Sequence, residues 1–148
     1  KFFFNYGHFR SQAPWHQMYV IRQRPRVGLY DLGNPNLAPP KTTAYETGVE
    51  YNLLDRFLLR ISGYYKDIKG QHGNVAYHNR QGTVNYDSWR NNNYEDIYGL
   101  ELNITKRTGQ WITGWLNYDF MFQKSGLVGR SDFYEDESQE ALFGLYEG

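Results

Sequence analysis

Alternation between apolar and polar side chains dominates two neighbouring stretches of the chain. In residues 45–53 every second position except Thr47 is apolar or aromatic, and the positions between them carry charged, amide or small side chains. In residues 57–66 the positions Phe57, Leu59, Ile61, Gly63 and Tyr65 share a face, against Leu58, Arg60, Ser62, Tyr64 and Lys66. A period of two residues over this length is typical of β-strands. The short link 54–56 therefore predicts a hairpin.

Folding the chain about Asp55 predicts the register of this hairpin. The predicted pairs are Tyr45 with Tyr65, Val49 with Ile61, and Glu50 with Arg60. In this register the apolar faces coincide and opposite charges meet on the polar face, and both effects favour it.

A second pair of strands is predicted downstream, at 98–105 and 112–123, with a tight turn at 106–109. Each strand has about ten residues, the length that a tilted strand needs to cross a bilayer. The residues expected to face lipid are Val49, Leu59, Ile61, Leu100, Leu102, Ile104, Ile112 and Leu116. Those expected to face a polar interior are Glu46, Glu50, Arg60, Lys66, Glu101 and Asp119.

The first forty residues give weaker patterns. Residues 1–9 predict a strand with two aromatic faces, so its orientation stays open. A short strand is expected at 17–22 within a mostly irregular stretch, 15–43. Four prolines after residue 24 restrict the backbone and remove hydrogen-bond donors, which argues against a continuous strand there.

Long polar connections follow the predicted strands. Residues 68–93 are rich in Asn, Gly and Gln, and we expect them to form a loop holding a hairpin with short strands at 74–78 and 83–87. Residues 138–146 predict either a helical turn or the start of a strand. Short turns at one end and long loops at the other are typical of a transmembrane β-barrel. The predicted fold is all-β, an antiparallel transmembrane barrel segment of about five strands.

Composition narrows the class of protein. Aromatic residues make up 18% of the chain, including 14 Tyr, which fits the aromatic girdles of membrane barrels. A net charge of zero argues against a nucleic-acid partner. Mean hydropathy is −0.76 and no apolar run approaches a membrane helix, so a helical membrane protein is excluded.

Four motifs carry a resemblance to a known family. Residues 33–51, GNPNLAPPKTTAYETGVEY, resemble a recurrent segment of TonB-dependent receptor barrels, G-N-P-x-L-x-P-E-x-T followed by a strand with E-x-G-x-E. Pro40 stands where Glu is common in that family. Three further stretches also resemble the family: residues 6–14, YYKDI at 64–68, and YEDIYGLE at 94–101.

The resemblance implies a 22-stranded barrel around a plug, with short periplasmic turns and long extracellular loops. Residues 1–148 would then be a partial, internal piece of that barrel, and the plug would lie upstream. The implied function is active uptake of a scarce ligand, of the iron–siderophore, cobalamin or glycan class, across the outer membrane. The implied partners are outer-membrane lipid, this ligand, and the TonB energising complex through the plug region.

Aromatic side chains give the candidate binding site. Tyr77, Tyr86 and Trp89, with Tyr94 near them in sequence, could form a ligand platform in an extracellular loop, because aromatic rings offer a large contact area. The alternative is that these rings pack the loop against its neighbours.

Other chemistry finds little support in the sequence. There is no cysteine, and His72 and His78 match no zinc signature. The acidic residues of 132–140 lack the spacing of a calcium loop. No nucleophile elbow or phosphate-cradling loop is present, so we expect neither an enzyme nor a cofactor.

Two other protein classes share some of these features. A porin or an adhesin would show the same alternation but would not need the segment 33–51. A soluble, aromatic-rich β-domain that binds carbohydrate would use one strand face as a packed core.

Overall fold

The computed structural model describes residues 1–26, 28–81, 83–109, 111–136 and 138, and these are mostly strands. The elements are β1 (Phe2–Arg10), α1 (Trp15–Tyr19), β2 (Ile21–Arg24), β3 (Gly28–Leu32), β4 (Lys41–Leu53), β5 (Phe57–His78), β6 (Asn85–Lys106), β7 (Gly114–Leu127) and β8 (Asp132–Tyr134). The predicted all-β class is confirmed. None of the described helices is long and apolar enough to cross a membrane.

The chain divides into two compact units. The first unit contains Lys1–Phe9, Lys41–Lys69 and Glu95–Ser125. The second contains Arg10–Pro40, Gly70–Tyr94 and Gly126–Gly148. Strands β5 and β6 contribute to both units, and each unit is described separately below.

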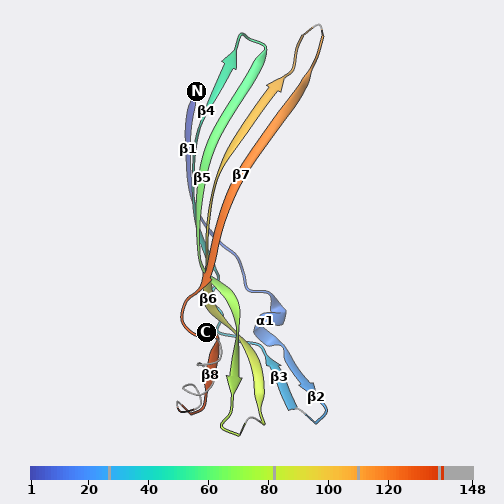
Figure 1. Cartoon of the computed structure of the whole chain (residues 1–148), viewed down its shortest axis with the longest axis vertical. Coiled ribbons are helices and arrows are strands. Elements are labelled where there is room, and N and C mark those ends of the chain that lie inside the picture. The colour runs from blue at the N-terminus through green and yellow to red at the C-terminus, as the bar shows by residue number, and fades with distance from the viewer. Residues whose placement is uncertain (27, 82, 110, 137, 139–148) are drawn as a thin grey trace. The chain divides into compact units, whose positions relative to one another are not determined.

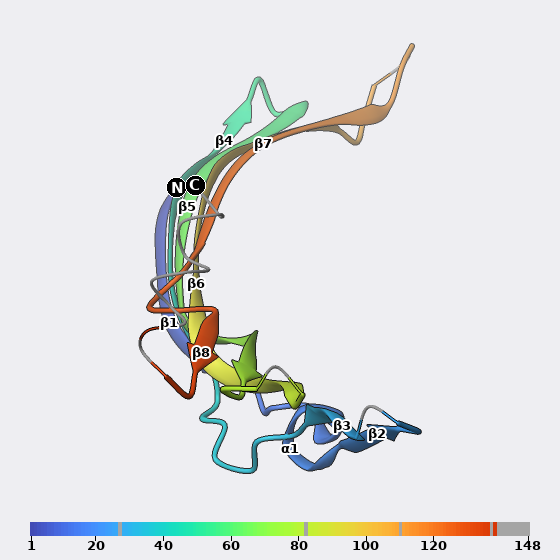
Figure 2. The ribbon, with the colours of Figure 1, turned by 60° about the horizontal axis from the view of Figure 1, so that its bottom comes forward.

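Five long strands build the first unit, in the order β1-β4-β5-β6, with β7 paired to β6 (Figure 1). This agrees with the expected five-strand segment. The connections β4–β5 and β6–β7 lie at the same end of this unit (Figure 1), as the sequence predicted for its short turns. Within the unit, β4, β5 and β7 bend in the same direction (Figure 2).

The register of the β4–β5 hairpin is the predicted one. Tyr45 pairs with Tyr65, Val49 with Ile61, and Glu50 with Arg60, without a bulge. Leu54 and Asp55 have φ angles of 55° and 53°, and the Arg56 amide donates to the Leu53 carbonyl over 3.2 Å. These two left-handed residues form the centre of the tight turn within the three-residue link 54–56, and their conformation matches the twist of the strands that the link joins.

Alternation gives the first unit two unlike faces. The apolar face carries the odd-numbered residues of β4 and β5 and the even-numbered residues of β1 and β6, and its large side chains, such as Phe4, Ile61 and Leu100, are exposed. The polar face carries the intervening residues. The open orientation of β1 is therefore resolved: Tyr6 shares the apolar face, and Phe3 lies on the polar face beside Arg60.

The second unit holds the short elements. The antiparallel pair β2–β3 lies beside α1 in both views (Figures 1 and 2), and β3 pairs in parallel with β6. A side-chain atom on Gly33 would meet the Met18 backbone at 2.6 Å, so glycine permits this close packing. The strand expected at 17–22 is wrong: residues 15–19 are helical and the strand begins at Ile21.

Two other expectations are corrected. The hairpin expected within 68–93 is present, since β5 ends at His78 and β6 begins at Asn85, but its strands are not short elements in a loop: they are extensions of β5 and β6, each of which has 22 residues. The polar composition of this stretch suggested a loop, yet the backbone pairing between β5 and β6 continues through it. The turn expected at 106–109 is also too short, since β6 ends at Lys106 and β7 begins at Gly114. The stretch predicted at 138–146 lies outside the described residues, apart from Ser138.

Candidate functional site

Aromatic rings form a row across the apolar face of the first unit. Tyr45 packs against Tyr6 on β1, with ring centroids 5.0 Å apart, and against Tyr65 on β5 at 6.4 Å. Further along the sheet, Tyr98 stacks on Phe122 at 5.2 Å. We call these five residues the aromatic row. Such rows mark the membrane–water interface in transmembrane barrels.

The polar face carries an ion-pair network centred on Arg60. Its guanidinium lies 3.1 Å from Glu46 Oε1 and 3.9 Å from Glu50 Oε1. The Asn5 amide donates to Glu46 Oε2 at 3.1 Å. The predicted Glu50–Arg60 contact is thus present, and it is worth about 1 kcal/mol or less because the groups are partly exposed.

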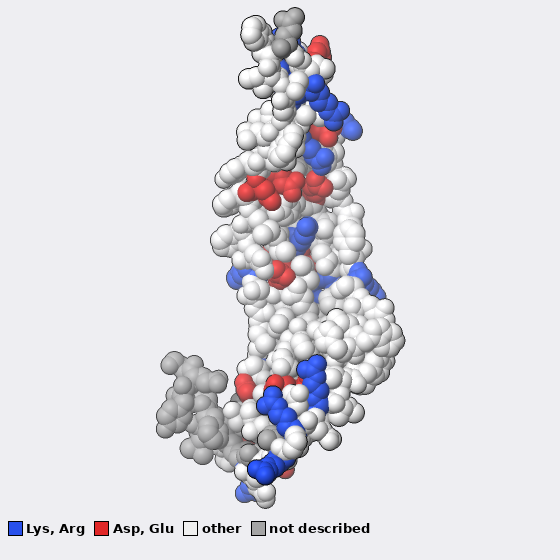
Figure 3. All heavy atoms as spheres, turned by 90° about the vertical axis from the view of Figure 1, so that its right-hand side faces the viewer, with Lys and Arg blue, Asp and Glu red and all other residues white. Residues whose placement is uncertain are grey.

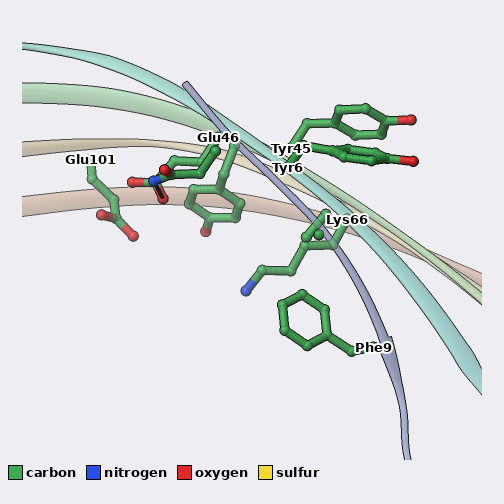
Figure 4. Close-up of a pocket in the computed structure, with 10 residues that line it drawn as sticks. Tyr6, Phe9, Tyr45, Glu46, Lys66 and Glu101 are labelled. Carbon is green, nitrogen blue, oxygen red and sulfur yellow. Dashed lines mark hydrogen bonds between the residues drawn. The ribbon is translucent and has the colours of Figure 1, made fainter. Parts of the chain in front are cut away.

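A cavity of about 380 Å³ opens on this polar face (Figure 4). Glu46, Lys66 and Glu101 line it, and the Lys66 ammonium lies 5.2 Å from the centre of the Tyr64 ring. In Figure 4, Lys66 and Phe9 lie on the opposite side of the ribbons from Tyr6 and Tyr45. Acidic and basic groups also lie beside one another in the view of Figure 3. The polar face is therefore a surface of mixed charge.

Two of the three predicted site residues meet in the second unit. Tyr77 and Tyr86 stack with ring centroids 5.0 Å apart, across the β5–β6 pair. On its other side, Tyr77 stacks on Phe133 of β8 at 5.3 Å. Arg90 lies over the Phe133 ring at 4.3 Å. Because Tyr77 is held between two rings, its main contacts are packing contacts.

Trp89 does not join this stack. It lies an odd number of residues from Tyr86 on the same strand, so its side chain projects from the opposite face. There it packs edge-on against His16, with centroids 6.5 Å apart. Tyr94 is also separate, packed against Gly126. The predicted cluster is therefore divided between two faces of the sheet.

An open cavity of about 670 Å³ adjoins the Tyr77–Tyr86 stack. Its lining includes Val84, Tyr86 and Phe133 together with Glu135. Aromatic surface beside a few polar groups is the usual composition of a small-ligand site.

Residues 131–136 are fastened to the end of the β5–β6 hairpin. The pair His78 Nε2 and Asp132 Oδ1 are 3.1 Å apart, and the His78 ring stacks on Tyr134 at 4.9 Å. Arg80 contacts Asp136 at 3.6 Å. The Ser131 hydroxyl, followed by the hydrogen bond and charge of His78, lowers the pKa of Asp132 below its ordinary value. Hydrogen bonds from Ser138 lower the pKa of Asp136.

Sequence reasoning missed Phe133, Arg90 and Asp132 as members of this region. Their contacts depend on β8 pairing in parallel with β5, where Tyr77 meets Phe133 and His78 meets Tyr134. The only signal in the sequence was the short alternation in Asp132-Phe133-Tyr134, which is too brief to identify a partner strand.

His72 serves a structural role. Its Nε2 lies 3.0 Å from the Ala38 carbonyl oxygen, and its Nδ1 lies 2.7 Å from Gln17 Oε1. The Asn91 amide group exchanges two hydrogen bonds with the Ala38 backbone and donates a third to Gly70. Within the described ranges, no group of three or more His, Asp or Glu side chains is close enough to hold a metal ion.

Comparison with known proteins connects these surfaces to a family. No curated protein matches the chain. Residues 1–144 match the family model described as TonB dependent receptor-like, beta-barrel. This family consists of outer-membrane receptors and transporters rather than enzymes. The match covers the strands with their two unlike faces and also the segment 33–51, which resembles TonB-dependent receptor barrels. It confirms the resemblance seen in the sequence. The chain therefore belongs to the TonB-dependent receptor β-barrel family.

Proposed function

We propose that this chain is part of the wall of an outer-membrane barrel that takes up a scarce ligand with energy delivered through TonB. The ligand would belong to the iron–siderophore, cobalamin or glycan class. The observation that carries the proposal is the family match over residues 1–144 together with the two unlike faces of the first unit. Further strands would complete the barrel, and an upstream plug region would engage TonB.

The first unit would span the outer membrane. Its exposed apolar face, bounded by the aromatic row, is suited to lipid. Its polar face, with the Arg60 network and the cavity at Lys66, is suited to a water-filled interior that contacts a plug. The residues proposed to face lipid include Leu100 and Leu102.

The second unit would form extracellular loops that capture the ligand. Support comes from the cavity beside Tyr86, where aromatic surface adjoins polar groups. Tyr86 is the member of the stack that we assign to ligand contact, because Tyr77 lies between two other rings. Trp89 would contact ligand only if the ligand reached the opposite face of the hairpin.

Single substitutions distinguish these two faces. In the receptor that carries this chain, we expect Tyr86→Ala to weaken ligand binding about tenfold, since an aromatic contact is worth about 1 kcal/mol beyond its buried area. We expect Trp89→Ala to leave binding nearly unchanged. Binding would be measured with a panel of ferric siderophores, cobalamin and oligosaccharides, followed by uptake of the probe that binds.

The control is Tyr86→Phe, which keeps the ring and should retain most of the affinity. Loss of affinity in Trp89→Ala but not in Tyr86→Ala would place the ligand on the other face. Unchanged binding in both variants would overturn the assignment of these loops to ligand capture, while leaving the family membership intact.

A further inference from the structure

An apolar groove on the first unit faces away from the polar surface. The cavity has a volume of about 530 Å³ and is lined by residues from five strands, including Phe4, Tyr45, Gly63, Leu100 and Phe120. It runs beside the aromatic row, on the face that family membership assigns to lipid. The groove is therefore a depression within a surface already suited to hydrocarbon.

The depth of the groove comes from Gly63. This residue pairs with Thr47 in the middle of the β4–β5 ladder, and its φ angle lies outside the left-handed region. A Cβ atom there would first meet Leu100 Cδ2, at 3.4 Å, which is ordinary contact. Neither backbone conformation nor crowding requires glycine. Since glycine weakens a strand interior, its presence is typical of a place where another molecule approaches the backbone.

Charged groups gather beyond the aromatic row on the same face. Lys41 and Lys69 are direct partners in the register, and each lies an even number of residues from the row. Lys124 follows Phe122 by two positions on β7. Lys69 is 73% exposed and pairs with Asp67 at 2.8 Å, and the Tyr65 hydroxyl donates to Asp96 at 2.8 Å. Three lysines and two carboxylates thus lie beyond the row on this face.

In this arrangement the positive charge of Lys41 is available to a negatively charged ligand. Like charges directly opposite each other on a sheet are unfavourable unless something offsets them. Asp67 offsets Lys69, whereas Lys41 forms no ion pair with the residues that the structure describes. An anionic group beside Lys41 would remove the repulsion and add charge-assisted hydrogen bonds.

We propose that the groove binds one acyl chain of a lipid whose phosphate-bearing headgroup contacts Lys41. The chain would lie over Gly63 between Tyr45 and Leu100, and the phosphate would lie beyond the aromatic row. The site is at the end of the unit opposite the short turns, which corresponds to the outer leaflet if those turns are periplasmic. The inference rests on the proposed placement in the membrane and adds a specific lipid site to it.

Native mass spectrometry of the purified receptor in detergent tests the site without any transported ligand. Phosphatidylglycerol would be titrated against a phosphate-free glycolipid with the same acyl chains. We expect Gly63→Leu to reduce bound phosphatidylglycerol several-fold, because leucine fills the groove. We expect Val49→Leu, a change on the same face outside the groove, to leave it unchanged. Lys41→Gln should weaken the binding of phosphatidylglycerol but not the binding of the glycolipid.

Each alternative result decides against part of the proposal. If Gly63→Leu retains as much lipid as the wild-type protein, the groove is not the binding site. If the wild-type protein binds phosphatidylglycerol and the glycolipid equally, the headgroup phosphate makes no contact that contributes to binding. Inorganic phosphate that displaces phosphatidylglycerol completely would show a free-anion site instead. If Gly63→Leu fails to fold, as judged by heat-modifiable gel mobility, Gly63→Ala replaces it, since its Cβ fits at 3.4 Å. Ligand uptake is assayed separately, so loss of lipid binding with normal uptake would leave the proposed function standing.

Discussion

Asp132 illustrates how single side chains in the second unit act through partners far along the chain. It meets His78 across 54 positions of sequence, and its neighbour Phe133 completes a stack with Tyr77. The Asp132 carboxylate accepts hydrogen bonds from Ser131 and His78, so its ionised form is favoured when the segment is in place. A group of this kind makes local stability depend on pH.

The attachment of residues 131–136 to the hairpin should weaken in acid. Because the pKa of Asp132 is lowered from its ordinary 3.8 in the folded state, its contribution is complete above that value and is lost as pH falls through the folded-state pKa. At neutral pH, Asp132→Asn should lower the local opening free energy by about 1 kcal/mol, a value reduced because the pair is partly exposed. Amide hydrogen exchange of Ala76 and Glu135, whose amides bond across this contact, measures the opening.

The control for this prediction is Asp55→Asn, in the turn of the other unit. It should not change exchange at Ala76 or Glu135. Exchange in Asp132→Asn that matches the wild-type protein between neutral pH and pH 3 would show that the carboxylate does not hold the segment.

The strands differ in how well their bounds and pairing can be predicted from the sequence. The alternation in β4 and in the first half of β5 is regular, so their pairing and register followed from side chains alone. Beyond Lys69 the alternation ends, yet β5 continues to His78. Backbone hydrogen bonds need no apolar side chain, and here both faces carry packed rings among polar residues: Tyr77 stacks on Tyr86 on one face, and Trp89 packs against His16 on the other. Neither face is purely apolar, so no pattern of period two appears. The same reason explains the unexpected length of β6.

Three side chains fix the segment 34–40 to this sheet: Asn91, His72 and, from the segment itself, Asn34, which donates to the Trp89 carbonyl. Asn91 makes three hydrogen bonds, two with the Ala38 backbone and one with Gly70. Asn91→Ala should therefore reduce the local stability of 34–40 by about 1 kcal/mol, because its three hydrogen bonds are exposed and water replaces part of each one that is lost. Limited proteolysis of the folded receptor should show faster cleavage within 34–40. Asn74→Ala, at an exposed position of β5, is the matched control. Equal cleavage in both variants would assign the anchoring to other contacts, such as that of His72.

At the scale of the whole molecule, the first unit is a wall rather than a domain with a core. Val75 of the second unit is 1% exposed, whereas large apolar side chains of β1, β6 and β7 in the first unit are exposed. Five strands that present an apolar face to the outside need lipid on that face, and their outer edges need neighbouring strands. Family membership supplies the reason for both requirements.

A charge on the lipid-facing side should hinder membrane assembly. Leu102→Arg is expected to cost about 2–4 kcal/mol if Leu102 lies near the bilayer midplane. Asn103→Arg, one residue away on the polar face, should assemble normally because its side chain projects into water. Folding into lipid vesicles, followed by heat-modifiable gel mobility, compares the two variants. Normal assembly of Leu102→Arg would refute the assignment of this face to lipid.

Local alternation and short motifs were enough to predict the all-β class, the β4–β5 register, the two unlike faces and the family. Three features could not be predicted without the fold: Tyr77 lies between Tyr86 and Phe133, Trp89 faces away from them, and residues 15–19 are helical. Parallel pairing of β8 with β5 brings together segments more than fifty residues apart. A three-residue strand carries too little pattern to specify its partner, so packing and backbone hydrogen bonds across the fold make that choice.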